Sequence, residues 1–114
     1  MTDCIFCKIA QAEVKARIIY SDEDVVAFHD TNPQAPTHIL VIPRKHIPSI
    51  TDCTPEDLPI VTRVLEVCAK LAEHESIRGS GYRLVLNAGK DAGQVINHIH
   101  FHVLGGRKMA WPPG

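Results

Sequence analysis

The sequence predicts an α+β fold in which an antiparallel sheet packs against one long helix. Five short segments have the composition of strands, one amphipathic segment lies between the third and the fourth, and the other connections are short. The 114 residues are enough for a single domain, 1–114, with one hydrophobic core. The pattern leaves open whether the helix forms a parallel crossover.

The first three expected strands follow one another closely. Residues 17–20 (RIIY) and 25–29 (VVAFH) are separated by SDED, which is typical of a turn because its side chains hydrogen-bond nearby backbone. Residues 30–36 form a loop, since two prolines fix φ and lack an amide hydrogen. Residues 38–42 (HILVI) are apolar almost throughout, which predicts a central, covered strand.

The expected helix begins near Thr54. Thr54 is a good N-cap, Pro55 suits the first helical position, and Asp57 lies in the first turn. The apolar residues that follow recur at helical spacing, which predicts about five turns with one stripe against the sheet. That stripe consists of Leu58, Val61, Leu65, Cys68 and Leu71 or Ala72.

The last two expected strands flank a glycine-containing loop. Residues 82–87 (YRLVLN) and 98–104 (HIHFHVL) have strand character, and Gly89 and Gly93 lie between them. The remaining tail is 105–114, which ends in Trp-Pro-Pro-Gly.

Composition excludes several classes of protein. The formal charge of −1 gives no basic surface for nucleic acid, and 45% hydrophobic residues argue against disorder. No apolar run approaches the roughly 18 residues that span a bilayer, and no signal peptide is recognisable, so we expect a cytoplasmic protein without a membrane partner. Among four cysteines, Cys4 and Cys7 form a CxxC, which favours reduced thiols or a metal over disulfides.

Three histidines alternate near the C-terminus. Side chains in a strand point alternately to opposite faces, so His98, His100 and His102 would share one face at a spacing of roughly 6.6 Å. A phosphate or a metal could approach two of them at once. A polar solvent face is the alternative, although it gives no reason for three titratable imidazoles in register.

The string His-Ile-His-Phe-His-Val-Leu resembles the motif of the histidine-triad superfamily. Four further segments resemble its Hint branch: DCIFCKI, AFHDTNPQAPTHILVIPRKHI, NAGKDAGQ and LGGRKMAWPPG. The resemblance implies the HIT-like fold, with a five-stranded antiparallel sheet, one long helix and a short N-terminal helix. It also implies a homodimer with a ten-stranded sheet, in which the tail 105–114 lies at the interface and Trp111 flanks the leaving group.

The same resemblance implies a hydrolase of purine nucleoside phosphoramidates or acyl-nucleotides, of the adenosine 5'-monophosphoramidase type. His100 would attack the α-phosphorus, and water would then release AMP or GMP without a catalytic cofactor. Its other ring nitrogen should carry a proton and donate to a carbonyl. His102 is the implied general acid, and His98 and His38 would orient the site, although His38 could equally be a strand-end histidine.

The resemblance also assigns a nucleotide pocket. Asp30 with Thr31 would bind the ribose, although Asp30 could simply form a turn. Val95 stands where many relatives have Ser or Thr. One side-chain hydrogen bond to the phosphate, of about 1.5–3 kcal/mol if nothing replaces it, would therefore be missing, and we expect an altered rate rather than lost activity. Asn97 stands where an aromatic residue is usual, and its amide would either reach the ligand or face solvent. Asn87 is implied to contact the phosphate or the ribose. The other implied phosphate contacts are Gly93, Gln94, Val95, His100 and His102, and the implied base contacts are Phe6, Ile9, Ile18 and Phe28.

Some members of the superfamily bind a structural zinc, and its four ligand types are present here. They are Cys4, Cys7, His46 and His98. Three other functions remain open. The first is a nucleotide-binding regulatory module with incidental catalysis, and the second is a zinc-dependent interaction domain. The third is a nucleotidyl transferase, which His102 disfavours because such branches usually have Gln there.

Overall fold

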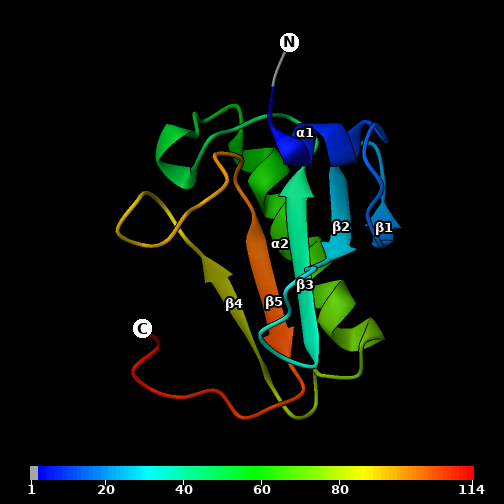
Figure 1. The fold of residues 1–114 in the computed structure, drawn as a ribbon, viewed down its shortest axis with the longest axis vertical. Coiled ribbons are helices and arrows are strands. Elements are labelled where there is room, and N and C mark those ends of the chain that lie inside the picture. The colour runs from blue at the N-terminus through cyan, green and yellow to red at the C-terminus, as the bar shows by residue number, and fades with distance from the viewer. Residues whose placement is uncertain (1–2) are drawn as a thin grey trace.

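A computed structural model describes residues 3–114 and shows a five-stranded antiparallel sheet (Figure 1). The strand order is β1-β2-β3-β5-β4, and every neighbouring pair is antiparallel, which confirms the predicted fold class. The strands are β1 Ile18–Ser21, β2 Val25–His29, β3 Thr37–Pro43, β4 Tyr82–Leu86 and β5 Phe101–Gly105, and the helices are α1 Ile5–Ala10, the short 3₁₀ helix η1 Ile50–Asp52 and α2 Leu58–His74.

The long helix α2 connects two strands that run in the same direction. β3 and β4 are each antiparallel to β5, which lies between them. The connection is therefore a crossover over one intervening strand, although no two neighbouring strands of the sheet are parallel. This answers the question that the sequence pattern left open.

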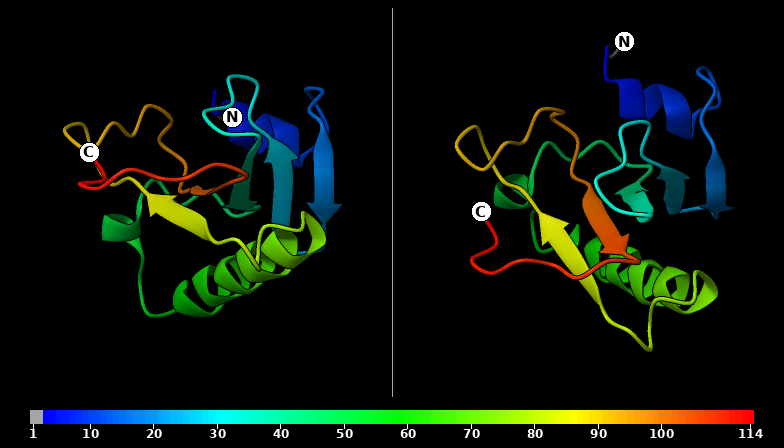
Figure 2. Two further views of the ribbon diagram at one scale, coloured as in Figure 1. Left: turned by 90° about the horizontal axis from the view of Figure 1, so that it is seen from below. Right: turned by 60° about the horizontal axis from the view of Figure 1, so that its bottom comes forward.

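The two faces of the sheet bury separate hydrophobic clusters. Ile39 and Val41 of β3 pack with α2, whereas Leu40 and Ile42 pack with α1 on the other face. Figure 2 shows α2 along one face, with α1 near the opposite face at one end. Burying each such side chain contributes about 1.5–3 kcal/mol. The uninterrupted apolar run in β3 thus reflects a strand covered on both sides, as predicted.

The helix begins later than expected. Thr54 precedes a turn that spans residues 55–57 and includes Pro55, and the α-helix starts at Leu58. The buried carboxylate of Asp57 does not cap the helix. It accepts from the backbone and hydroxyl of Thr54 and pairs with Lys45, whose hydrogen bond lowers the pKa of Asp57. Pro59 occupies the first helical turn, the place that was assigned to Pro55.

The last strand is also shorter than predicted. His98 and His100 precede β5, which pairs with β3 only from Phe101 onward. The opposite end of β3 is Pro43, which has no amide hydrogen to extend the ladder. The segment before β5 is instead held by a hydrogen bond from the Ile99 amide to the Ile47 carbonyl, at 2.7 Å.

Beyond β5 the chain runs back beside β4 (Figure 1). The strand includes Gly105, so the extended tail is 106–114. Arg83 of β4 donates to the Ala110 carbonyl at 2.8 Å, and Trp111 is 82% exposed. Within residues 3–114, no helix has the length and apolar character needed to cross a membrane.

Candidate active site and metal-binding cluster

A hydrogen bond to the backbone fixes which nitrogen of the neutral His100 ring carries the proton. Its Nδ1 lies 2.8 Å from the His98 carbonyl oxygen, which can only accept, so Nδ1 carries the proton. Nε2 is then the nitrogen with a lone pair, as a nucleophile requires. The ring is buried and packs edge-on against Phe6, with centroids 5.1 Å apart. This geometry meets the condition that the sequence analysis set for His100.

A relay of hydrogen bonds fixes the tautomer of His102. The Gln34 amide donates to Nδ1 of His38 at 3.0 Å, so the proton of neutral His38 is on Nε2. That Nε2–H donates to Nδ1 of His102 at 2.9 Å. Nε2 of His102 therefore carries its proton and can donate to a ligand. The Nε2 atom of His100 is consequently an acceptor, and the Nε2 atom of His102 is a donor.

Burial keeps this relay neutral. Desolvation, followed by the neighbouring His100 and His38, lowers the pKa of His102 to about 4. Burial also lowers the pKa of His38, and Asp30, whose carboxylate lies 3.4 Å from His38 Nε2, opposes that shift. His102 therefore acts near pH 7 as an N–H donor without a full charge.

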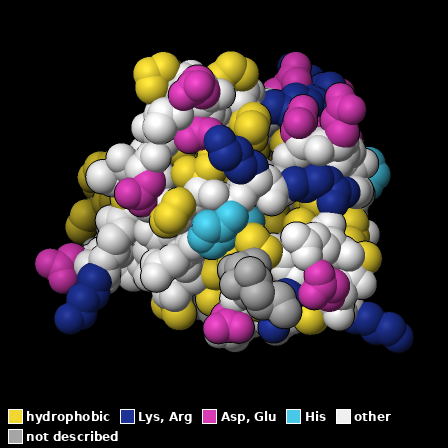
Figure 3. All heavy atoms as spheres, turned by 90° about the horizontal axis from the view of Figure 1, so that it is seen from above, with side chains coloured by type: hydrophobic (Ala, Val, Ile, Leu, Met, Phe, Trp, Pro, Cys, Tyr) yellow, Lys and Arg dark blue, Asp and Glu magenta, His cyan; other side chains and the backbone are white. Residues whose placement is uncertain are grey.

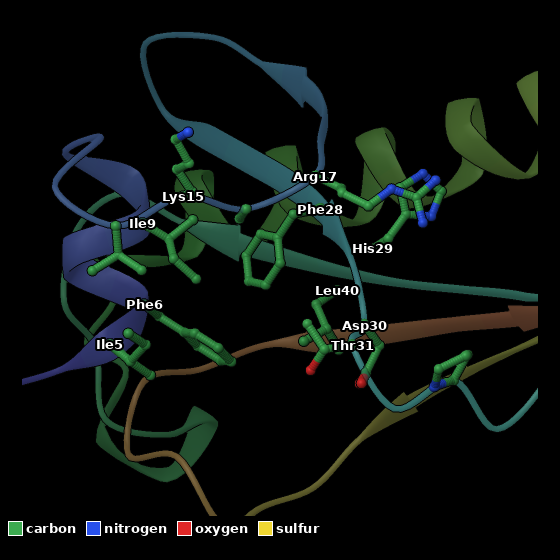
Figure 4. A pocket seen from close by; sticks show the side chains of 13 residues that line it. Ile5, Phe6, Ile9, Lys15, Arg17, Phe28, His29, Asp30, Thr31 and Leu40 are labelled. Carbon is green, nitrogen blue, oxygen red and sulfur yellow. The ribbon is translucent and has the colours of Figure 1, made fainter.

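A cavity of about 640 Å³ is lined by Phe6, which packs on His100, and by Asp30, which approaches His38 (Figure 4). One part is apolar, and the other part contains Asp30 and Thr31. Three of the four expected base contacts line it, namely Phe6, Ile9 and Phe28. Leu40 and the basic residues Lys15 and Arg17 also line it, although no periodicity in the sequence marks a residue that lines a cavity from a loop or from a neighbouring strand. The lining residues are Ile5, Phe6, Ile9, Val14, Lys15, Ala16, Arg17, Phe28, His29, Asp30, Thr31, Pro33 and Leu40.

Ile18 requires a correction, because it does not line this cavity. Its side chain is 47% exposed on the edge strand β1. The pairing of β1 with β2 is irregular between Ile18 and Tyr20, so simple alternation does not give the direction of the side chain.

Asp30 forms a turn and also lines the cavity. Its Oδ1 accepts from the Asn32 amide at 2.8 Å and so forms a turn. Its carboxylate also lines the cavity and approaches His38. Each carboxylate oxygen has more than one lone pair, so the turn leaves capacity for ribose hydroxyls.

The glycine loop holds its own shape through Gln94. The side-chain amide accepts from the Gly89 amide at 3.0 Å and donates to the Pro48 and Ile96 carbonyls at 2.6 and 3.1 Å. The Gln94 side chain therefore stabilises the loop, and both its oxygen and its nitrogen already form hydrogen bonds within the protein. Gly93 has φ +87°, which favours glycine.

The other expected phosphate contacts lie apart from the large cavity. Val95 is 85% exposed and lines a separate hollow with Asn97 and His46. Asn87 follows β4 and is half-buried, and its expected phosphate contact stays a prediction.

Four side chains of the types that bind metals converge, with His98 Nδ1 among their donor atoms. Nδ1 of His98 lies 3.4 Å from Cys4 Sγ, 3.5 Å from Cys7 Sγ and 3.2 Å from His46 Nδ1. Cys7 Sγ and His46 Nδ1 are 3.3 Å apart. A tetrahedral zinc with bonds of about 2.0–2.3 Å requires donor separations of about 3.3–3.8 Å, so the spacing fits.

The hydrogen bonding around His98 also fits a metal ligand. Its Nε2 lies 2.8 Å from the Pro43 carbonyl, so Nε2 carries the proton and Nδ1 presents its lone pair to the cluster. Of the four residues only His46 is exposed. Figure 3 shows histidine atoms at the surface of the face that is viewed from above.

Comparison with known proteins identifies the family. The HIT domain model matches residues 11–109, so the chain belongs to the HIT family. The purine nucleoside phosphoramidase of Escherichia coli K12 is 46% identical over 107 residues, which are 94% of this chain and 90% of that protein.

Solved structures agree with this assignment. A HIT family hydrolase from Legionella pneumophila Philadelphia 1 has TM-score 0.96 and 48% identity, covering 98% of this chain and 100% of that one. A histidine triad protein from Clostridium difficile has TM-score 0.93 and 42% identity, covering 96% of each. The resemblance that was noted in the alternating histidines is thereby confirmed.

The low pKa of His102 predicts a pH-dependent stability. The unfolded chain binds this proton near pH 6.5, whereas the folded chain resists it until about pH 4, so stability is lost as the pH falls through this window. Between pH 7 and pH 5, urea unfolding of the wild type should lose about 2 kcal/mol more than that of His102→Gln. His74→Gln, on an exposed part of α2, should follow the wild type. Equal losses in wild type and His102→Gln would contradict this account.

Proposed function

We propose that this HIT protein hydrolyses purine nucleoside phosphoramidates, of the adenosine 5'-monophosphoramidase type, and the related acyl-nucleotides. The observation that carries the proposal is the unprotonated Nε2 of His100 beside a cavity with an apolar part and a carboxylate. The 46% identical phosphoramidase of E. coli supports the same substrate class. The purine would lie among Phe6, Ile9 and Phe28, and the ribose at Asp30.

The first step forms a covalent nucleotidyl-histidine. The lone pair of His100 Nε2 attacks the α-phosphorus, and the bond from phosphorus to the amine breaks. The His98 carbonyl stabilises the positive charge that develops on the His100 ring, because it already accepts the Nδ1 proton. The amine takes up a proton from solvent as it leaves, because neutral His102 has a single N–H and would become an imidazolate if it gave that proton away.

In the second step, water is the nucleophile and His100 is the leaving group. Water attacks the phosphorus, the bond from phosphorus to His100 Nε2 breaks, and the proton lost by water replaces the one that the amine carried away. His102 donates to the phosphoryl oxygens in both steps, since its Nε2–H is fixed by the relay from Gln34 through His38. The products are the amine and AMP or GMP.

The test is turnover of adenosine 5'-phosphoramidate with intact mass of the protein after rapid quenching. Wild type should release AMP and gain the mass of one AMP moiety, whereas His100→Ala should lose at least 10³-fold of the rate and show no gain. His74→Ala serves as a control for loss of a histidine elsewhere. AMP binding without turnover in the wild type would overturn the hydrolase proposal and favour a nucleotide-binding module.

We further propose that Cys4, Cys7, His46 and His98 bind one structural zinc ion. The donor spacing and the unprotonated Nδ1 of His98 support this proposal. Four protein ligands would leave no open position for a substrate, so zinc would stabilise the fold rather than take part in the chemistry. It would tie α1 to the segment that carries the histidines.

Elemental analysis checks the zinc proposal. Protein purified without chelator should contain about one zinc per chain, and Cys7→Ser should lose most of it together with several degrees of melting temperature. Cys53→Ser, outside the cluster, should retain the metal. Metal-free wild type with unchanged stability would contradict the proposal.

We propose that two copies pair along β4. This strand forms an outer edge of the sheet, and Leu84 on it is 38% exposed. Leu58 and Leu65 of α2 are 52% and 42% exposed. Apolar side chains at an unpaired sheet edge are unfavourable in water and are typical of an interface.

Light scattering should give twice the 12.6 kDa chain mass, whereas Leu84→Lys should shift the protein toward monomer. Wild type at the mass of one chain would contradict pairing.

A further inference from the structure

The apolar part of the large cavity has a basic residue at its margin. Lys15 lies in the segment between α1 and β1 and lines the cavity. Figure 4 shows it on the side where α1 supplies Ile9, away from Asp30 and Thr31. If the ribose binds at Asp30, Lys15 lies at the end that receives the base.

The ammonium group of Lys15 is available to a ligand. Its side chain is exposed, and within the described residues no hydrogen bond or ion pair engages it. The side-chain acceptors of the cavity are His29, Asp30 and Thr31, of which Asp30 and Thr31 lie at the ribose end (Figure 4). The base end therefore offers a hydrogen-bond donor and no side-chain acceptor.

A donor without an acceptor distinguishes the two common purines. The edge of guanine presents O6 and N7, which both accept hydrogen bonds, whereas adenine presents the acceptor N7 and an amino group that donates. A lysine ammonium has three donors and no acceptor. It can therefore bind O6 and N7 of guanine, but it opposes the amino group of adenine.

We propose that Lys15 selects 6-oxopurine nucleotides, so that guanosine and inosine phosphoramidates are the preferred substrates of this protein. The inference rests on the proposed function of the site and specifies its substrate. Because the lysine is solvent-exposed, we expect its preference for guanine over adenine to lie at the lower end of the range for such contacts, about five-fold. Apolar contact with Phe6, Ile9 and Phe28 holds either purine and does not discriminate between them.

The experiment compares guanosine, inosine and adenosine 5'-phosphoramidates by kcat/KM, and GMP, IMP and AMP by calorimetric Kd. In the wild type, guanosine and inosine should each exceed adenosine about five-fold. Lys15→Met keeps an unbranched chain without the charge, and it should bring both ratios close to one. Lys15→Arg should retain the preference. Lys8→Met is the matched control, since Lys8 lies on α1 but does not line the cavity, and it should retain the wild-type ratios.

The outcomes separate this inference from the proposed function. Turnover of all three substrates with equal kcat/KM, or ratios that Lys15→Met leaves unchanged, would overturn the role of Lys15 and leave the hydrolase intact. A preference for guanosine alone would assign selection to the 2-amino group and also overturn it. Nucleotide binding with the expected preference but no turnover would overturn the hydrolysis and support Lys15. Failure to bind any of the nucleotides would overturn both.

Discussion

The position of His98 determines how the rest of the site is arranged. Its carbonyl fixes the proton of His100, its Nε2–H binds the Pro43 carbonyl at the end of β3, and its Nδ1 faces two cysteines and a second histidine. One residue therefore connects the central strand, the candidate nucleophile and the candidate zinc ligands. Its complete burial makes each of these polar contacts costly to lose, because an unsatisfied polar group in the interior costs about 1–3 kcal/mol.

The sheet places the remaining groups around that position. β3 and β5 are neighbours, so His38 near the start of β3 faces His102 in β5. The face that α2 leaves uncovered is closed at one end by α1, and the cavity lies between α1 and the strands. Apolar packing thus provides the wall of the cavity, while strand pairing provides the distances between histidines. The loop from Asp30 to Pro36 contributes the Gln34 amide that sets the relay.

Much of this arrangement could be predicted from the sequence. The apolar run of β3, the amphipathic pattern of α2 and the histidine motif indicated the fold and the site, because each leaves a local periodicity. The predicted start of α2 was wrong. The carboxylate of Asp57, which was expected in the first helical turn, binds Lys45, a residue distant in sequence. The predicted start of β5 was too early, because Pro43 on the neighbouring strand has no amide hydrogen to extend the ladder. Ile18 and Lys15 show the same limit, since lining a cavity depends on contacts between segments rather than on spacing along one.

The central claim is that the hydrogen bonds give His100 the opposite tautomer to His38 and His102. Long-range proton–nitrogen correlation spectra of ¹⁵N-histidine protein at pH 7, assigned with single-histidine variants, measure this directly. The account predicts a proton on Nδ1 and none on Nε2 of His100, with Nε2 protonated in the other two. A proton on Nε2 of His100 would contradict it, because that nitrogen could then not attack phosphorus.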